Sequence, residues 1–229
     1  MKVGIIQSNF LPWRGYFDTI REVDLFIVYD DVQYTRRDWR NRNTIKTPRG
    51  LEWITVPVKV RGFDQQIQHT PVDYSTPWAG RILNKIRDSY VWAPHFEPYF
   101  SELTVALNQE WRTISQLNQT LIHWACRHLK IDTRIVESTE FRPRGSKTER
   151  IVDLVQQAGG DVLLAGPSAR NYFVPELFDD AGIRLEYKAY DYATYEQLYP
   201  PFEPNVSIID ALFMNGPDTH LHVRPRASG

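Results

Sequence analysis

The sequence predicts an α/β protein with an open, mostly parallel, Rossmann-like sheet and helices on both faces. The first observation is a short apolar run at residues 3–6, followed by a helical pattern and a second apolar run at residues 25–29. A strand, a helix and a strand within about 30 residues make the βαβ unit of a parallel sheet. The second observation is that more short apolar runs alternate with helical patterns along the chain. This alternation is typical of α/β folds.

The individual elements follow from the period of the apolar residues. Apolar and β-branched runs predict strands at residues 3–6, 25–29, 53–60, 132–138, 162–165 and 183–187. Pro57 indicates that the third of these strands lies at a sheet edge, because proline donates no ladder hydrogen bond. A helix is expected to begin at Gly15 and end near Asp24, and further helices are expected at residues 77–92, 101–111, 115–129, 146–158, 175–180 and 207–214. Ser146 and Glu149 form the pattern of a capping box at the start of the helix expected at residues 146–158.

The length and composition predict one domain. The chain has 229 residues, of which 42% are hydrophobic, and this is enough for one substantial core. We expect residues 1–216 to form a single α/β catalytic domain that includes a helical block at about residues 77–129. No core pattern follows Gly216, so residues 217–229 are expected to form a flexible tail.

The composition also excludes several classes of function. The net charge of -1 gives no general affinity for nucleic acid or an acidic membrane. No stretch approaches the roughly 20 apolar residues of a membrane span. Cys126 is the one cysteine, which indicates a cytoplasmic protein, and its place in an amphipathic helix predicts a core thiol. The histidines lack metal-ligand spacing, so we expect no metal site.

Three polar segments follow predicted strands or precede predicted helices. In an open parallel sheet, ligands bind beyond the carboxyl ends of the strands. Residues 7–15 follow the first strand, residues 30–46 follow the second, and residues 166–168 follow the strand at 162–165. We therefore expect these three segments to converge on one site.

The first segment combines polar and aromatic residues with a glycine at a helix start. Gln7, Trp13 and Tyr16 are candidate substrate-binding residues, and Gly15 leaves backbone amides free to bind an anion such as phosphate. The segment lacks the GxGxxG pattern of dinucleotide-binding proteins. The alternative is an ordinary strand–helix loop with Trp13 packed on the core.

The second segment holds the densest set of candidate residues. Asp30 and Asp31 come directly after a strand, and either could act as a general base, hold an amine or hydroxyl, or pair with an arginine. Guanidinium, ammonium and amide groups suit phosphate, carboxylate or sugar hydroxyls. The alternative is a solvated basic loop. The candidate binding residues here are Gln33, Arg42, Asn43 and Lys46, whereas Arg36, Arg37, Arg40 and Arg49 are expected at the rim or in solvent.

Two more candidates lie further along the chain. Ser168 follows a Gly-Pro turn and is expected to bind substrate or position backbone, with a nucleophilic role as a minor option because the GxSxG pattern is missing. Lys147 stands beside a helix start, where it is a candidate phosphate contact or an exposed lysine.

An ordered set of motifs resembles the WbqC-like protein family. The resemblance runs from about residue 3 to residue 216, with Phe10 where the family usually has tyrosine and Ala165 where serine is expected. The motifs are Gln7-x-x-x-Leu11-Pro12-Trp13-x-Gly15-Tyr16-Phe17, Asp30-Asp31-Val32-Gln33-Tyr34, Trp39-x-Asn41-Arg42-Asn43-x-Ile45-Lys46, Thr55-Val56-Pro57-Val58, Lys147-Thr148-x-Arg150, Leu164-x-Gly166-Pro167-Ser168-x-x-x-Tyr172 and Phe202-x-Pro204-Asn205-x-Ser207-Ile208-Ile209-Asp210.

The resemblance implies a role in O-antigen, nucleotide-sugar or natural-product biosynthesis. The leading hypothesis is a transferase that moves an acyl or aminoacyl group from an activated donor onto the amine of an amino sugar or natural-product intermediate. The donor would be a carrier-protein or coenzyme A thioester, or an adenylate, so an acyl or peptidyl carrier protein is a candidate partner and no bound prosthetic group is expected. In this hypothesis Asp30 or Asp31 is the base or orients the amine, while Gln7 and Ser168 orient the carbonyl. Arg42, Asn43 and Lys46 hold an anionic donor or acceptor.

Two other hypotheses stay open. The first βαβ unit also resembles the start of a nucleotidylyltransferase fold, which implies an enzyme that uses ATP or another nucleotide. The signature histidines of that superfamily are absent, and Tyr16 follows Gly15 where a Gly-His pair would stand. The last hypothesis is a non-catalytic module that recognises a sugar nucleotide or a partner enzyme.

Overall fold

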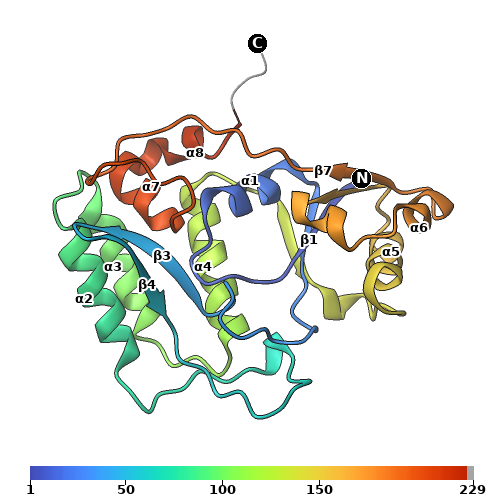
Figure 1. The fold of residues 1–229 in the computed structure, drawn as a ribbon, viewed down its shortest axis with the longest axis horizontal. Coiled ribbons are helices and arrows are strands. Elements are labelled where there is room, and N and C mark those ends of the chain that lie inside the picture. Colours follow the sequence, from blue (N-terminus) through green and yellow to red (C-terminus); the bar gives the residue numbers. More distant parts are fainter. Residues whose placement is uncertain (226–229) are drawn as a thin grey trace.

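The structure is a computed structural model that describes residues 1–225. Within that range, five strands form one parallel sheet in the order β5-β2-β1-β6-β7 (Figure 1). Counted along the chain, this order is third, second, first, fourth, fifth, so the predicted open Rossmann-like sheet is confirmed. Its strands are β1 (Lys2–Ile6), β2 (Leu25–Val28), β5 (Arg134–Glu137), β6 (Val162–Ala165) and β7 (Arg184–Tyr187).

Helices cover both faces of this sheet, as predicted. Successive strand side chains point to opposite faces. In β2, Ile27 therefore packs in a cluster with Leu154 of α5 (Lys147–Gln157), while Phe26 packs in the cluster that holds Phe17 of α1 and Leu121 of α4. The helices α1 (Arg14–Glu22) and α4 (Ile114–His128) lie on that second side, and α6 (Pro175–Asp180) lies with α5 on the first.

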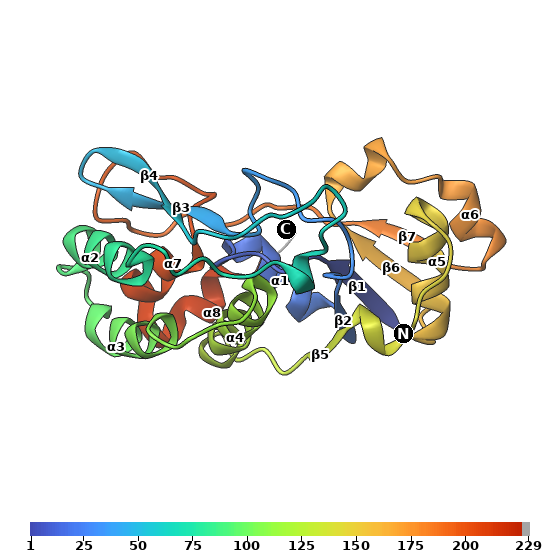
Figure 2. The same ribbon diagram turned by 90° about the horizontal axis from the view of Figure 1, so that it is seen from below.

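The expected helical block is present and gains a partner from the end of the chain. It consists of α2 (Trp78–Tyr90), α3 (Phe96–Leu107) and α4. The helix α7 (Ile208–Asn215) packs against α3, where the rings of Phe96 and Phe213 lie 5.2 Å apart. Figure 2 shows this block at one end of the molecule and the sheet with α5 and α6 at the other. One apolar cluster runs from the sheet face into the block.

The strand expected at residues 53–60 ends at Thr55, before Pro57, and belongs to a two-stranded hairpin apart from the main sheet. In the structure β3 (Arg42–Thr47) pairs antiparallel with β4 (Gly50–Thr55). The turn places Gly50 at φ 102°, a conformation that glycine adopts at little cost. The strand β3 was not predicted because its sequence is polar. Residues 43–47 are nevertheless buried, by contacts with other parts of the chain.

The chain past Gly216 is more ordered than expected. A 3-10 helix (Gly216–Asp218) and the short helix α8 (Thr219–His222) follow α7. Thr219 and Val223 are buried, so the core extends beyond the predicted end of the domain. Residues 226–229 of the expected tail lie outside the described residues. Other 3-10 helices are Ile67–His69, Ser138–Glu140 and Pro167–Asn171.

Among residues 1–225, no helix is both long and apolar enough to cross a membrane. Cys126 is buried in α4, and burial raises the pKa of its thiol to about 12. The thiol therefore stays protonated near neutral pH, which agrees with the predicted core position.

Candidate functional site

A cavity of about 330 Å³ opens where the β1–α1 loop, the β3 region and the segment before α7 meet. Its wall includes residues of the loop that follows β1, one of the two strands between which the strand order reverses. Two indoles and three carboxamides dominate its wall, and none of the residues in that wall carries a charge. They are Asn9, Pro12, Trp13, Trp39, Asn43 and Asn205.

Trp13 forms one side of the cavity because neighbouring residues hold its ring. Tyr190 and Tyr192 contact the indole edge-on, with ring centroids 4.9 and 6.1 Å away. On the other side, a Cβ atom at Gly15 would lie 2.3 Å from the indole. The sequence hypothesis explained Gly15 by an anion site at the helix start. The structure gives a steric reason instead, because only glycine leaves room for this ring.

Asn43 is buried and ties the hairpin to the β1–α1 loop. Its amide nitrogen donates to the carbonyls of Phe10 and Leu11 at 3.2 and 2.7 Å, and its amide oxygen accepts from the backbone nitrogen of Thr44 at 2.8 Å. Both amide hydrogens therefore have partners within the protein. Asn43 shapes the cavity wall, and little of its hydrogen-bonding capacity is left for a ligand.

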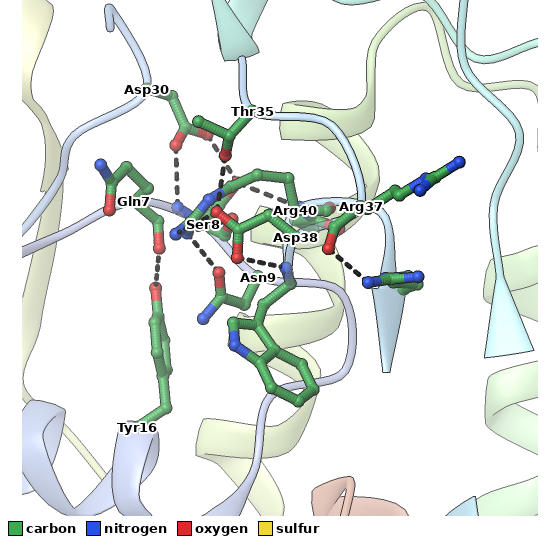
Figure 3. A network of polar contacts seen from close by, with 12 residues as sticks. Gln7, Ser8, Asn9, Tyr16, Asp30, Thr35, Arg37, Asp38 and Arg40 are labelled. Atoms are coloured by element: carbon green, nitrogen blue, oxygen red, sulfur yellow. Dashed lines mark hydrogen bonds and ion pairs between the residues drawn. The ribbon is translucent and has the colours of Figure 1, made fainter. Parts of the chain in front are cut away.

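Arg40 joins the loops that flank the cavity (Figure 3). Its guanidinium donates to the amide oxygen of Asn9 and to the carbonyl of Ser8, and it lies 3.6 Å from the Asp38 carboxylate. The prediction that Arg40 lies at the rim was wrong, since its side chain is buried. Because Arg40 takes up the amide oxygen of Asn9, the amide N–H groups of Asn9 are free to face the cavity.

Asp30, which follows β2, is hydrogen-bonded to Ser8, which follows β1. Its carboxylate accepts from the backbone nitrogen and hydroxyl of Ser8 at 2.8 and 2.6 Å, and from the Ser115 hydroxyl at 2.5 Å. Burial raises the pKa of Asp30, although these hydrogen bonds and the charge of Arg40 lower it in part. Asn118 of α4 also donates to the Ser8 hydroxyl, at 3.1 Å. Asp30 therefore orients the loop that carries Asn9.

Asp38 is the other carboxylate of this network, and it was not among the predicted site residues. It accepts from the Thr35 hydroxyl at 2.6 Å and from the backbone nitrogen of Trp39 at 2.7 Å. Burial raises the pKa of Asp38, but Arg40 and these two hydrogen bonds outweigh burial and leave the pKa below its usual value. Asp38 is therefore ionised at neutral pH.

Asp31 points to a different cluster from Asp30. Its carboxylate pairs with Arg150 of α5 and accepts from the Ser138 hydroxyl at 2.6 Å. This cluster connects the ends of β2 and β5 to α5. The two adjacent aspartates thus lie in separate networks, as expected for neighbouring residues at the end of a strand, whose side chains point to opposite sides.

The other predicted residues of the first two segments lie around the cavity without lining it. The hydroxyl of buried Tyr16 donates to the backbone carbonyl of Gln7 at 3.2 Å (Figure 3). Gln33 is exposed and donates to the carbonyl of Phe63 at 2.7 Å. The buried Lys46 ammonium donates to the side-chain oxygen of Gln197 at 2.9 Å and to a backbone carbonyl of the same segment. Lys46 therefore anchors residues 197–201.

Arg42 lies on the outer side of the cavity wall. Its guanidinium packs over the Trp53 ring, 4.1 Å from the centroid, and donates to the backbone carbonyl of Arg37. Trp53 in turn contacts Trp39, with ring centroids 5.4 Å apart. The wall residue Trp39 thus connects the cavity to an exposed aromatic and cationic surface.

Ser168 and Lys147 are exposed and do not line the cavity. Ser168 lies in the 3-10 helix Pro167–Asn171, and Lys147 begins α5. The third segment has only an indirect contact with the site, through Tyr190. The Tyr190 hydroxyl lies beside Gly166, and the Tyr190 ring contacts Trp13. The structure therefore brings together two of the three predicted segments.

Six residues of this site were not among the predicted site residues. Asn9, Pro12, Trp39 and Asn205 line the cavity, and Arg40 and Asp38 hold its wall. Asn205 lies within one of the family-like motifs and Asn9 lies within the first polar loop. The sequence therefore held a signal for each of these two residues. Arg40 and Asp38 resemble ordinary loop charges, and only their burial distinguishes them.

Fold and cavity together define a Rossmann-like α/β protein with a cavity beside the loop that follows β1. The model of the WbqC-like protein family matches residues 7–221. The chain is 46% identical over 226 residues to the uncharacterized protein Rv1507c of Mycobacterium tuberculosis, a match that covers 97% of each chain. No solved structure matches the chain significantly. The chain belongs to the WbqC-like protein family.

Proposed function

We propose that the chain is a biosynthetic transferase that moves an acyl or aminoacyl group onto the amine of an amino sugar or natural-product intermediate. The donor is a carrier-protein or coenzyme A thioester, or an adenylate, and the acceptor binds in the cavity. The observation that carries this proposal is the uncharged cavity wall of two indoles and three carboxamides beside the loop that follows β1.

The chemistry of this wall fits a sugar-like acceptor. Indole faces pack against the C–H groups of a sugar ring, and carboxamides can both donate to and accept from hydroxyl groups. Asn205 is exposed at the opening, and the amide N–H groups of Asn9 are free for a ligand because Arg40 takes its oxygen. The volume of about 330 Å³ is at the lower end for small-molecule pockets. The enclosed part of the ligand is therefore small.

The reaction forms one amide bond and breaks one bond of the donor. The acceptor nitrogen attacks the donor carbonyl carbon, and the C–S bond of a thioester or the C–O bond of an adenylate breaks. The thiol or nucleotide leaves, and the nitrogen gives up one proton to a base. In this proposal Asn9 donates to the carbonyl oxygen or to an acceptor hydroxyl. Arg40 is a positioning residue that orients Asn9.

The three carboxylates of residues 30–38 are each assigned a role in this proposal. Asp30 is buried among Ser8 and Ser115 and acts as a positioning residue. Asp31 stays paired with Arg150. Asp38 is kept ionised and holds Trp39 and Arg40 in place, so it is also a positioning residue.

A transfer assay tests the proposal. The protein is incubated with coenzyme A thioesters or aminoacyl adenylates and a panel of amino sugars, and mass spectrometry detects the amide product. Asn205→Ala is expected to raise the KM for the acceptor, while Asn84→Ala on the exposed side of α2 serves as the matched control. Failure of every donor to acylate any amine in the panel would contradict the proposal.

The strand order favours one second candidate, an ATP-using nucleotidylyltransferase-like enzyme. The switch between β1 and β6 is the place where nucleotides bind in related sheets. Release of pyrophosphate from ATP with an amino sugar or sugar phosphate would support this candidate. Binding of these compounds without any turnover would instead favour a non-catalytic binding module.

A further inference from the structure

The wall of the cavity continues outward into a surface that the acceptor site does not use. This surface, the aromatic rim, consists of Trp39, Trp53, Arg37 and Arg42. Trp39 belongs both to the cavity and to the rim. A ligand that is larger than the small enclosed volume can therefore extend over Trp39 onto the aromatic rim.

The two indoles of the aromatic rim are both exposed and lie side by side. Trp39 and Trp53 each keep 43% of their surface accessible, and their rings lie at an angle of 37° with centroids 5.4 Å apart. They make a contiguous aromatic patch at the mouth of a polar cavity. Exposed patches of this kind mark binding sites more often than isolated exposed residues do.

The cations of the aromatic rim have no carboxylate partner among residues 1–225. Nearby, Arg40 pairs with Asp38 and Arg49 pairs with Glu52, whereas neither Arg37 nor Arg42 takes part in an ion pair among the described residues. Arg42 packs on Trp53, and its buried Nε has no hydrogen-bond partner in the described residues. In Figure 3 the exposed side chain of Arg37 points away from Asp30 and Ser8.

We propose that the aromatic rim binds the phosphate group of a ligand whose other end occupies the cavity. Guanidinium groups bind phosphate through paired, charge-assisted hydrogen bonds. An uncharged cavity beside two unpaired guanidinium groups fits a ligand with a neutral polar end and an anionic end. The inference rests on the proposed function of the cavity and narrows its substrate class to phosphorylated compounds.

In the proposed reaction, either the acceptor or the donor can carry the phosphate group that the aromatic rim binds. The phosphate belongs either to a nucleoside diphosphate attached to the acceptor sugar or to the phosphopantetheine end of the donor. Uridine diphosphate (UDP) is the probe for the first source, and coenzyme A is the probe for the second. Uridine and pantetheine, which lack phosphate, are the matched controls.

The experiment measures the Kd of each probe by isothermal titration calorimetry with the full chain. UDP or coenzyme A is expected to bind at least about tenfold more tightly than its control without phosphate, since a charge-assisted hydrogen bond is worth that factor. Arg37→Gln and Arg42→Gln are each expected to weaken binding by about tenfold. Arg134→Gln, an exposed arginine on β5, is the control and is expected to bind as wild type.

Binding by UDP alone assigns the phosphate to the acceptor, and binding by coenzyme A alone assigns it to the donor. The inference is overturned if neither probe binds, if the controls without phosphate bind equally well, or if both arginine variants keep wild-type affinity. Arg37 is exposed, so Arg37→Gln is informative even if Arg42→Gln folds poorly. Transfer from a coenzyme A thioester to a UDP-linked amino sugar that both variants perform with wild-type KM values would retain the proposed function and reject the inference. Phosphate-dependent binding without any transfer would support the inference and reject the proposed function.

Discussion

The carboxylate of Asp30 accepts hydrogen bonds from both the backbone nitrogen and the hydroxyl of Ser8, at 2.8 and 2.6 Å. These bonds join the carboxyl ends of β2 and β1. Asn9 of the cavity wall comes directly after Ser8, so the position of Asn9 depends on Asp30.

Asp30→Ala is expected to lower the free energy of unfolding by about 3 kcal/mol, because the Ser8 nitrogen and two hydroxyls lose a buried acceptor. Asp30→Asn keeps an acceptor oxygen and is expected to cost less. Urea denaturation measures both variants. Loss of a general base would reduce kcat by about 100-fold or more. A fall of that size in folded Asp30→Asn would show that the positioning role is incorrect.

Gly15→Ala is expected to displace the Trp13 indole, because the new Cβ would lie 2.3 Å from it. The overpacking should cost about 1 to 3 kcal/mol of stability and weaken ligand binding. Thermal denaturation and ligand titration measure the two effects. Gly80→Ala in α2 is the matched control, since its Cβ would meet nothing within 4 Å and should leave stability equal or higher. Equal behaviour of the two variants would exclude the steric explanation.

Arg40→Lys is expected to reduce the kcat/KM of transfer by at least about tenfold, because one ammonium cannot replace a planar guanidinium that contacts Asn9, Ser8 and Asp38 together. Arg36→Lys, at an exposed position in the same loop, is the control. Steady-state kinetics on proteins with matching circular dichroism spectra test this expectation. Unchanged kinetics in Arg40→Lys would remove the positioning role of Arg40.

Asp210 is expected to make stability fall as pH rises. Burial raises the pKa of its carboxyl above the ordinary value of 3.8, although Tyr195, Tyr90 and Gln197 lower it in part. The folded protein therefore binds this proton more tightly than the unfolded chain does. The stabilising contribution is complete below pH 3.8 and is lost as pH rises through the folded pKa.

Asp210→Asn removes this titration, so its free energy of unfolding should fall less between about pH 4 and about pH 7 than that of the wild type. Urea denaturation at several pH values measures the two slopes, with Asp132→Asn on the surface as the control. Parallel slopes for wild type and Asp210→Asn would contradict the raised pKa.

The sequence by itself determined the parallel sheet and the helices around it. The runs at Val3–Ile6 and Leu25–Val28 are apolar throughout because both faces of those strands are buried, and this composition is visible without a structure. The same reasoning placed Trp13 and Asn43 near a site, because loops after parallel strands meet at one edge of the sheet. The family-like motifs led to the same region.

Only the tertiary structure decided what these residues do. Asp30 and Asp31 are neighbours in sequence but lie in separate networks, because their side chains point to opposite sides of the strand end. The strand β3 is polar in sequence and buried by contacts with distant segments, so periodicity could not reveal it. Arg40, Asn9 and Asn205 come from three separate segments. Their convergence on one cavity depends on long-range packing, about which local sequence patterns carry little information.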